Sequence, residues 1–352
     1  MQFESKIIPL QVINDSITKK YGINLYILRT DLPHPPFRHL LHEEKGSGNN
    51  FLHPNISGNK LFKLKYNLQE AINQDKKILL TFGGAFSNHI AATAAAGKEY
   101  HFKTIGIIRG EKHSNLNPTL KFASDCGMEL HYVSRTLYQN KNELNEYVNR
   151  NFSEHNSYII SEGGSNELGI KGCEEITQSI NIDFDYVCTA CGTGATMTGI
   201  ILALKKNQKA IGFQILKAEN YIKNEVEEWL NKFANNELIK EDKKSGNNSE
   251  TIQTQSNWEI NDNYHFRGYA KVNQKLKDFV QQFEETNNIP LDFIYTGKMM
   301  FGIYDMIKKD FFKKDETIVA IHTGGLQGNA GFHFLEKNRT RMPQISQIFT
   351  DY

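Results

Sequence analysis

The stretch Ile56-Ser57-Gly58-Asn59-Lys60-Leu61-Phe62-Lys63-Leu64 organises the interpretation of this chain. From Leu61 onward, apolar residues recur at positions 61, 64, 68 and 72, which is the spacing of one helix face. Lys60 therefore stands in the first helical turn, where unpaired backbone N–H groups and the positive end of the helix dipole disfavour an ammonium group. A neutral amine there can form a Schiff base with a carbonyl, although a lysine at a helix start is more often part of a solvated surface.

Outward from this stretch, short strand-like runs alternate with helical runs, which predicts parallel α/β layers. In such sheets ligands bind at the carboxyl ends of the strands, and the glycine-rich turns of this chain fall at those ends. The expected strands are 25–29, 78–82, 104–108, 129–133, 158–161, 186–190, 211–216 and 317–321. The expected helices are 61–74, 90–100, 137–150, 167–180, 220–235 and 272–286, with two more after the turns at 191–199 and 295–298.

The turn Cys191-Gly192-Thr193-Gly194-Ala195-Thr196 lies between an expected strand and an expected helix. Consecutive backbone N–H groups, two threonine hydroxyls and the helix dipole make such a turn suited to a phosphate. It lacks the Gly-Lys-Ser/Thr of a Walker A loop and the GxGxxG spacing of a dinucleotide fold. A glycine-rich turn without any ligand is the alternative.

A Schiff-base lysine combined with a phosphate cradle, and no carboxylates placed for Mg²⁺, indicates pyridoxal 5′-phosphate. Ser87 and Asn88 follow a strand and precede a helix, so they can reach a cofactor and substrate or serve only as a helix cap. Thr296 and Thr323 stand at later turns, where a hydroxyl could meet the pyridine nitrogen.

The composition is that of a globular enzyme, with 352 residues, 39% apolar, 23% charged and a formal net charge of +1. This balance gives no reason to expect nucleic acid or an anionic membrane as a partner. No run approaches the roughly 18 apolar residues of a membrane span, and the N-terminus lacks the apolar stretch of a secretory signal. A cytoplasmic location is the expectation.

Cys188 and Cys191 form a CxxC pair, which raises the question of zinc or redox chemistry. No second CxxC or histidine pair at zinc spacing accompanies it, and the pair lies between a strand and a glycine loop. We therefore expect no metal site.

The chain resembles the pyridoxal-phosphate enzymes of fold type II, the tryptophan synthase β superfamily. Within them it resembles the 1-aminocyclopropane-1-carboxylate (ACC) deaminase and D-cysteine desulfhydrase family. The motifs that carry this resemblance appear in the family's order and cover most of the chain, but 33–50 and 236–257 do not match. They are 57–64, 83–88, 162–166, 191–196, 295–298 and 322–325.

The resemblance implies two open, mostly parallel α/β domains with the cofactor in the cleft between them. It implies a smaller domain, 62–170, and a larger cofactor-binding domain, 1–61 and 171–352, with surface excursions at 33–50 and 236–257. It also implies a homodimer that takes a small amino acid as its substrate.

The same resemblance implies roles for individual residues. Lys60 would hold the cofactor covalently, Asn88 would bond its phenolic oxygen, and Lys63 would bind its phosphate with the loop Cys191, Gly192, Thr193, Gly194, Ala195 and Thr196. Ser87 would lie near the substrate carboxylate. Tyr295 and Tyr269 match active-site tyrosines, although the residues around Tyr269 differ from those of the family.

Two positions bear on the reaction. ACC deaminases typically carry Glu in a Tyr-Glu-Gly-Lys motif and Leu before the later Gly-Gly, whereas this chain has Thr296 and Thr323. Beside a hydroxyl the pyridine ring is a weaker electron sink than beside a carboxylate. The weaker sink suffices when thiolate is the leaving group. The sequence thus favours α,β-elimination of D-cysteine, with ACC deamination as the alternative. A third possibility, a binding or regulatory protein with a degenerate site, conflicts with the complete set of expected cofactor residues.

Overall fold

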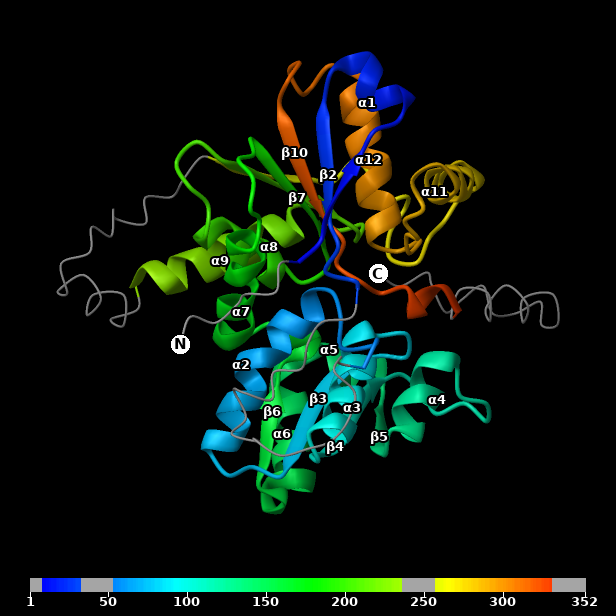
Figure 1. Ribbon diagram of the computed structural model, residues 1–352. Coiled ribbons are helices and arrows are strands. Elements are labelled where there is room, and N and C mark those ends of the chain that lie inside the picture. Colours follow the sequence, from blue (N-terminus) through cyan, green and yellow to red (C-terminus); the bar gives the residue numbers. More distant parts are fainter. Residues whose placement is uncertain (1–7, 33–52, 236–256, 331–352) are drawn as a thin grey trace, which may run out of the picture. The chain divides into compact units, whose positions relative to one another are not determined.

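The computed structural model describes residues 8–32, 53–235 and 257–330 (Figure 1). The chain divides into two compact units, each with its own sheet and core. Unit 1 comprises Met1–Arg29 and Cys173–His322, and unit 2 comprises Thr30–Gly172 and Thr323–Asp351. The domain boundaries expected from the sequence stay a prediction, and these units place the described residues 30–32 and 53–61 with the smaller sheet.

Unit 1 contains a sheet with the strand order β1-β2-β10-β7-β8-β9, in which β1 and β2 pair antiparallel and the other neighbours pair parallel. The central strand β7 is buried along its whole length, as expected when helices cover both faces. The strands are β1 (Leu10–Ile13), β2 (Asn24–Leu28), β7 (Tyr186–Cys191), β8 (Lys209–Gln214), β9 (Trp258–Asn261) and β10 (Thr317–Ile321).

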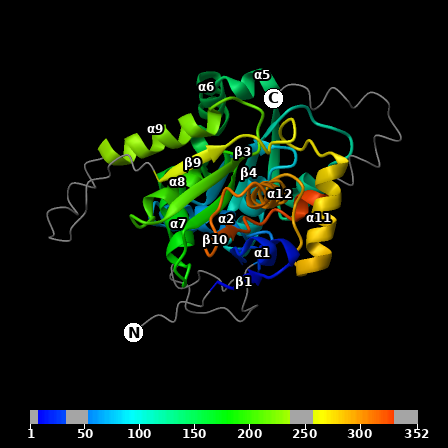
Figure 2. The ribbon, with the colours of Figure 1, turned by 90° about the horizontal axis from the view of Figure 1, so that it is seen from above.

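Helices pack on both faces of this sheet, α8 and α9 on one and α1, α11 and α12 on the other (Figure 1, Figure 2). Helix α12 contacts β7 and β8, and its apolar residues join those of α11 in a buried hydrophobic cluster. The helices are α1 (Ser16–Tyr21), α8 (Ala195–Leu202), α9 (Tyr221–Asn235), α11 (Gln274–Asn287) and α12 (Thr296–Lys308), and α7 (Glu167–Gln178) crosses the unit boundary.

Unit 2 contains a wholly parallel sheet with the order β5-β4-β3-β6. Its core is the run of apolar side chains on β3 and β4 together with the alanines of α3. The elements are α2 (Asn59–Asn73), β3 (Ile78–Gly84), α3 (Asn88–Glu99), β4 (Lys103–Arg109), α4 (Pro118–Asp125), β5 (Met128–Val133), α5 (Arg135–Gln139), α6 (Lys141–Phe152) and β6 (Ser157–Ile160).

The expected strands and the α/β class with mostly parallel sheets are confirmed, with boundaries that differ by one or two residues. The helix expected over 137–150 is two helices, because Asn140 ends α5 and its side chain accepts from Glu143 N to begin α6. Strands β1 and β9 and helices α1 and α4 were not predicted. The excursion at 33–50, and all but the last residue of 236–257, lie outside the described residues.

Candidate active site

Lys60 lies in the first turn of α2, directly after a turn that only glycine fits. Gly58 has a φ of +63°, and a Cβ there would lie 2.0 Å from the carbonyl oxygen of Thr323. Gly58 N donates to Thr30 O at 2.7 Å, and Asn59 N donates to Thr323 O at 3.3 Å. These contacts, all within unit 2, fix the start of α2, and the amine of Lys60 donates to Asn59 Oδ1 at 3.2 Å.

Lys63 lies one turn further along α2 and is buried. Its amine donates to the carbonyl oxygen of Gly163 at 3.0 Å. A Cβ on Gly164, whose φ is +68°, would lie 3.1 Å from Lys63 Cβ, so the backbone packs closely on this side chain. Lys63 thus joins α2 to the glycine turn 162–164, and its expected bond to a phosphate stays a prediction.

Ser87 and Asn88 lie where β3 leads into α3. Ser87 is the N-cap of α3, and its Oγ accepts from His89 N at 3.2 Å and from Ile90 N at 3.3 Å. The hydroxyl keeps its own proton to donate, since these bonds use only its acceptor capacity. Asn88 is the first residue of α3. The structure therefore shows Ser87 as a helix cap with its O–H proton still available as a donor.

His89 follows Asn88 in α3, and the sequence did not predict a role for it. Thr81 Oγ1 donates to Ile160 O at 2.8 Å, so it accepts the Nε2 proton of His89 at 2.9 Å. His89 Nδ1 is then an unprotonated acceptor, and it has no hydrogen-bond partner within the described ranges. Burial, and then the ammonium groups of Lys60 and Lys63, hold the pKa of His89 well below its usual value, which keeps the ring neutral. The sequence signal that could have identified His89 is a histidine directly after the Ser-Asn pair.

In unit 1, the loop from β7 to α8 has the geometry expected for an anion site. Gly194 is the N-cap of α8, with a φ of +77° and no side chain to cap the helix. A Cβ there would lie 3.3 Å from Val226 Cγ2, so the loop lies close to α9. The N-terminus of α8, which is the positive end of the helix dipole, thus lies at a glycine-rich loop that carries Thr193 and Thr196. The loop comprises Cys191, Gly192, Thr193, Gly194, Ala195 and Thr196.

Unit 1 also brings Tyr295 beside this loop. A Cβ on Gly192 would lie 3.4 Å from Tyr295 Cε1. The ring of Tyr269 meets that of Tyr295 edge to face, with centroids 6.1 Å apart and an interplanar angle of 74°. The two tyrosines proposed from the resemblance therefore form a pair next to Gly192.

Thr296, the first residue of α12, is completely buried with Asp292. Its Oγ1 donates to Asp292 Oδ2 at 2.6 Å and accepts from Asp292 N at 3.0 Å. The same carboxylate accepts from Thr296 N at 2.9 Å and caps the helix start. Because the hydroxyl proton is committed to Asp292, Thr296 can offer a further ligand only an acceptor lone pair.

The CxxC cysteines are free and buried. Burial, and then the charge of Glu259, raise the pKa of the Cys188 thiol, so it stays protonated. A protonated thiol is a poor metal ligand and a poor nucleophile.

The donors in each unit match chemically distinct parts of pyridoxal 5′-phosphate. Unit 2 offers the amine of Lys60 at a helix start, a group that can bond an aldehyde, and an amide side chain at Asn88, the first residue of α3. Unit 1 offers for the phosphate the N-terminus of α8, whose N-cap residue Gly194 has no side chain. These observations fit the cofactor that the sequence indicates.

Sequence comparison finds relatives over almost the whole chain. A Pyrococcus furiosus protein, provisionally named 1-aminocyclopropane-1-carboxylate deaminase, is 28% identical over 346 residues, which cover 94% of this chain and 92% of the relative. The mitochondrial bifunctional D-cysteine desulfhydrase/1-aminocyclopropane-1-carboxylate deaminase of Arabidopsis thaliana is 29% identical, covering 78% of this chain and 70% of its own length. The D-cysteine desulfhydrase of Klebsiella pneumoniae (strain 342) is 25% identical, covering 79% and 85%.

The fold is also that of a solved structure, the crystal structure of an ACC deaminase homologue. The TM-score is 0.73 at 24% identity, over 96% of this chain and 94% of that one. This likeness confirms the fold expected for a fold type II enzyme. Residues 49–324 match the family model described as pyridoxal-phosphate dependent enzyme. Because that match spans most of the chain, the protein belongs to the pyridoxal-phosphate-dependent enzymes and uses pyridoxal 5′-phosphate as its cofactor.

Proposed function

We propose that this enzyme catalyses the α,β-elimination of D-cysteine, which with one water gives pyruvate, ammonia and hydrogen sulfide. Relatives named D-cysteine desulfhydrase support the reaction class. The observation that carries the choice of substrate is the threonine at position 296, whose hydroxyl donates to Asp292.

The residue beside the pyridine nitrogen decides how firmly the cofactor's ring holds a proton. A hydroxyl whose proton is already donated can accept from a protonated ring nitrogen but brings no full negative charge to hold that proton. The ring is then a weaker electron sink than one beside a carboxylate. Thiolate is a good leaving group, so its elimination needs a weaker electron sink than the opening of the unactivated cyclopropane ring does.

We propose that Lys60 binds the cofactor covalently, that Asn88 bonds its phenolic oxygen, and that Lys63 binds its phosphate together with the loop 191–196. Thr296 and Thr323 are the candidate partners of the ring nitrogen. When bound, pyridoxal 5′-phosphate supplies the electron sink for negative charge at the substrate Cα. Support comes from the start of α2, which fixes the position of Lys60 in the helix, and from the glycine N-cap of α8.

The protein's own groups would move the protons. In its neutral form, the amine of Lys60 takes the Cα proton of the substrate. Ser87, a helix cap that still has a proton to donate, bonds the substrate carboxylate. Tyr295, paired with Tyr269, donates a proton to the departing thiolate.

ACC deamination, which gives 2-oxobutanoate and ammonia, is the second candidate. It is favoured by the provisional name of the Pyrococcus furiosus relative and by the bifunctional Arabidopsis thaliana relative. The two reactions share the cofactor and differ in the bond that breaks, because ACC has no proton on its Cα for Lys60 to remove.

The test assays the purified holoenzyme for pyruvate and sulfide from D-cysteine and for 2-oxobutanoate from ACC, with Lys60→Ala as the control. We expect sulfide and pyruvate in equal amounts, a much smaller rate with ACC, and no product from the control. Turnover of ACC alone would establish the second candidate. Turnover of neither substrate would refute both.

The homodimer stays a prediction from the resemblance, and the cytoplasmic location stays a prediction from the sequence. None of the helices in residues 8–32, 53–235 and 257–330 is long and apolar enough to cross a membrane.

A further inference from the structure

The segment between β9 and α11, residues 262–273, carries Tyr269 on an unusual backbone. Three non-glycine residues have positive φ angles, which are 53° at Phe266, 71° at Arg267 and 52° at Ala270. L-residues rarely adopt this conformation, because Cβ then crowds the following carbonyl oxygen. Such a segment persists only where the surrounding structure holds it.

Two consecutive turns shape this segment. Gly268 N donates to His265 O at 3.0 Å, and Lys271 N donates to Gly268 O at 3.2 Å. Positive φ at both central residues of the first turn resembles a type I′ turn, where asparagine and glycine are usual. Phe266 and Arg267 occupy those places instead.

The carbonyl oxygens that close both turns also accept from one buried side chain. Lys298 Nζ donates to His265 O at 3.0 Å and to Gly268 O at 2.7 Å. Lys298 is only 1% exposed and lies in the first turn of α12. Its amine therefore joins the two turns to the helix.

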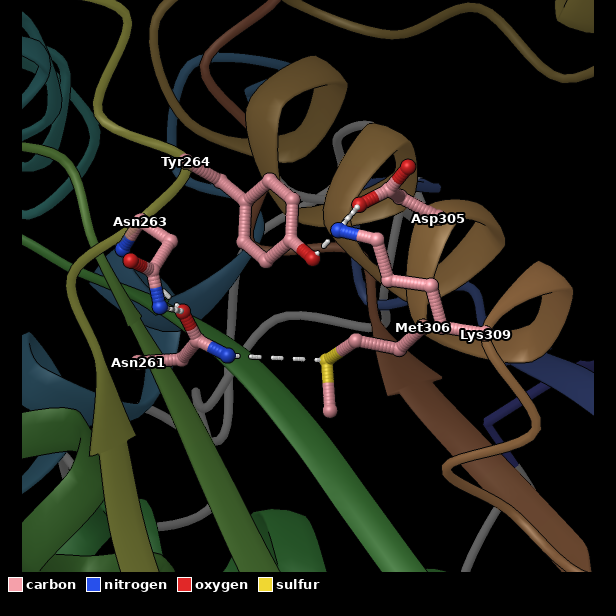
Figure 3. Close-up of polar contacts among 6 residues, drawn as sticks. All are labelled: Asn261, Asn263, Tyr264, Asp305, Met306 and Lys309. Atoms are coloured by element: carbon pink, nitrogen blue, oxygen red, sulfur yellow. Dashed lines mark hydrogen bonds and ion pairs between the residues drawn. The ribbon is translucent and has the colours of Figure 1, made fainter.

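Helix α12 holds the beginning of the segment by separate contacts (Figure 3). Tyr264 Oη donates to Asp305 Oδ2 at 2.8 Å, and Lys309 Nζ lies 2.7 Å from the same oxygen. A Cβ on Gly302 would lie 2.9 Å from Tyr264 Cδ2, so the ring rests on the helix backbone. Asp305 thus anchors the start of the segment, and Lys298 anchors the turns that lead to Tyr269.

We propose that Lys298 is a positioning residue whose amine holds the turns 265–268 and 268–271, and with them the ring of Tyr269 against Tyr295. The part of this proposal that concerns catalysis rests on the proposed function, because it takes Tyr269 as an active-site tyrosine. The part that concerns the backbone does not. Burial, partly offset by Asp292, lowers the pKa of Lys298 to about 7, and the neutral amine still has the two N–H donors that both bonds need.

Limited trypsin digestion of the holoenzyme tests the backbone. Cleavage after Arg267 and Lys271 is followed by mass spectrometry in the wild type, Lys298→Met and Lys298→Gln, with Lys308→Met, at an exposed position of the same helix, as the control. We expect both Lys298 variants to be cut at least tenfold faster at these bonds and the control to be cut at the wild-type rate. Two variants are used because one could fail to fold. Wild-type cleavage rates in whichever Lys298 variant folds would overturn the proposal.

Kinetics of the same proteins test the effect on Tyr269. We expect Lys298→Met to lower kcat about tenfold with little change in KM, and Lys298→Arg, which keeps N–H donors for the two carbonyl oxygens, to recover most of it. The loss should not add to that of Tyr269→Phe. Additive losses would overturn the link to Tyr269. If the wild type does not act on D-cysteine, the proposed function fails, and the digestion still decides the backbone role of Lys298.

Discussion

Thr296 and Asp292 are a buried pair whose chemistry bears directly on the choice of substrate. A glutamate at position 296 would bring a second carboxylate beside Asp292, and two buried carboxylates at such a distance cannot both ionise. The informative change is therefore the double variant Thr296→Glu/Asp292→Asn, in which the amide keeps one acceptor oxygen for the helix start.

We expect this double variant to lose about tenfold of its rate with D-cysteine and to gain a measurable rate with ACC. The reason is that a carboxylate near the ring nitrogen strengthens the electron sink. Pyruvate and 2-oxobutanoate are measured side by side, with Asp292→Asn alone as the control. Equal substrate preference in the control and the double variant would remove the argument from Thr296.

The free energy of unfolding should depend on pH through Lys298. Burial lowers its pKa from 10.5 to about 7, so between these values the unfolded chain keeps a proton that the folded chain has released. The free energy of unfolding then rises with pH in that window, by up to about 1.4 kcal/mol per pH unit. This contribution is lost as the pH falls towards 7.

The measurement is urea unfolding of the wild type and Lys298→Met at pH 6.5 and pH 9. We expect the stability of the wild type relative to the variant to be greater at pH 9, because the variant lacks this titration. A difference that stays constant across the two pH values would show that Lys298 keeps its ordinary pKa.

The turn before α2 depends on one glycine. At Gly58 the φ is +63°, and a Cβ would lie 2.0 Å from a backbone oxygen, so Gly58→Ala combines strain with a clash. We expect it to lower the free energy of unfolding by about 2–4 kcal/mol and to weaken cofactor retention, because Lys60 moves with the turn. Gly127→Ala is the matched control, since Gly127 has a φ of +90° and no atom within 4 Å of the added Cβ. Equal effects of the two changes would mean that the contact with Thr323 is unimportant.

Elements with a strong periodic pattern were predictable, and short polar elements were not. Strands buried on both faces of a parallel sheet are almost continuously apolar, so β3, β4 and β7 could be recognised in the sequence. Helix α1 is six residues long and mostly polar, and a capping box at Asp15 and Thr18 supports it rather than an apolar stripe. Strand β9 follows directly on the polar tract and has only four residues.

For the molecule as a whole, the sequence predicted where the candidate residues lie on the fold better than it predicted their contacts. Glycine turns and a helix-start lysine are local patterns, so the sequence correctly placed Lys60 at the start of a helix and the loop 191–196 between a strand and a helix. The commitment of Thr296 to Asp292 and of Lys63 to Gly163 depends on side-chain packing that no spacing reveals. The role of Lys298, which joins turns some thirty residues away, depends on tertiary structure in the same way.

The cofactor should stabilise the whole protein, because a ligand that binds only the folded state adds about 4 kcal/mol at a thousandfold excess over its Kd. Removing pyridoxal 5′-phosphate with hydroxylamine should lower the Tm by several degrees, and adding it back should restore the Tm. The Lys60→Ala variant should respond less, since it lacks the covalent bond. Identical Tm values with and without the cofactor would contradict its place in this fold.

The identity of the lysine that holds the cofactor is the most direct test of this account. Borohydride reduction of the holoenzyme fixes the bond between cofactor and amine, and peptide mass spectrometry then locates the added mass. The account predicts the pyridoxyl group on Lys60, together with loss of the visible absorbance band in Lys60→Ala. The group on Lys63 or Lys298, or a band that persists in the variant, would contradict it.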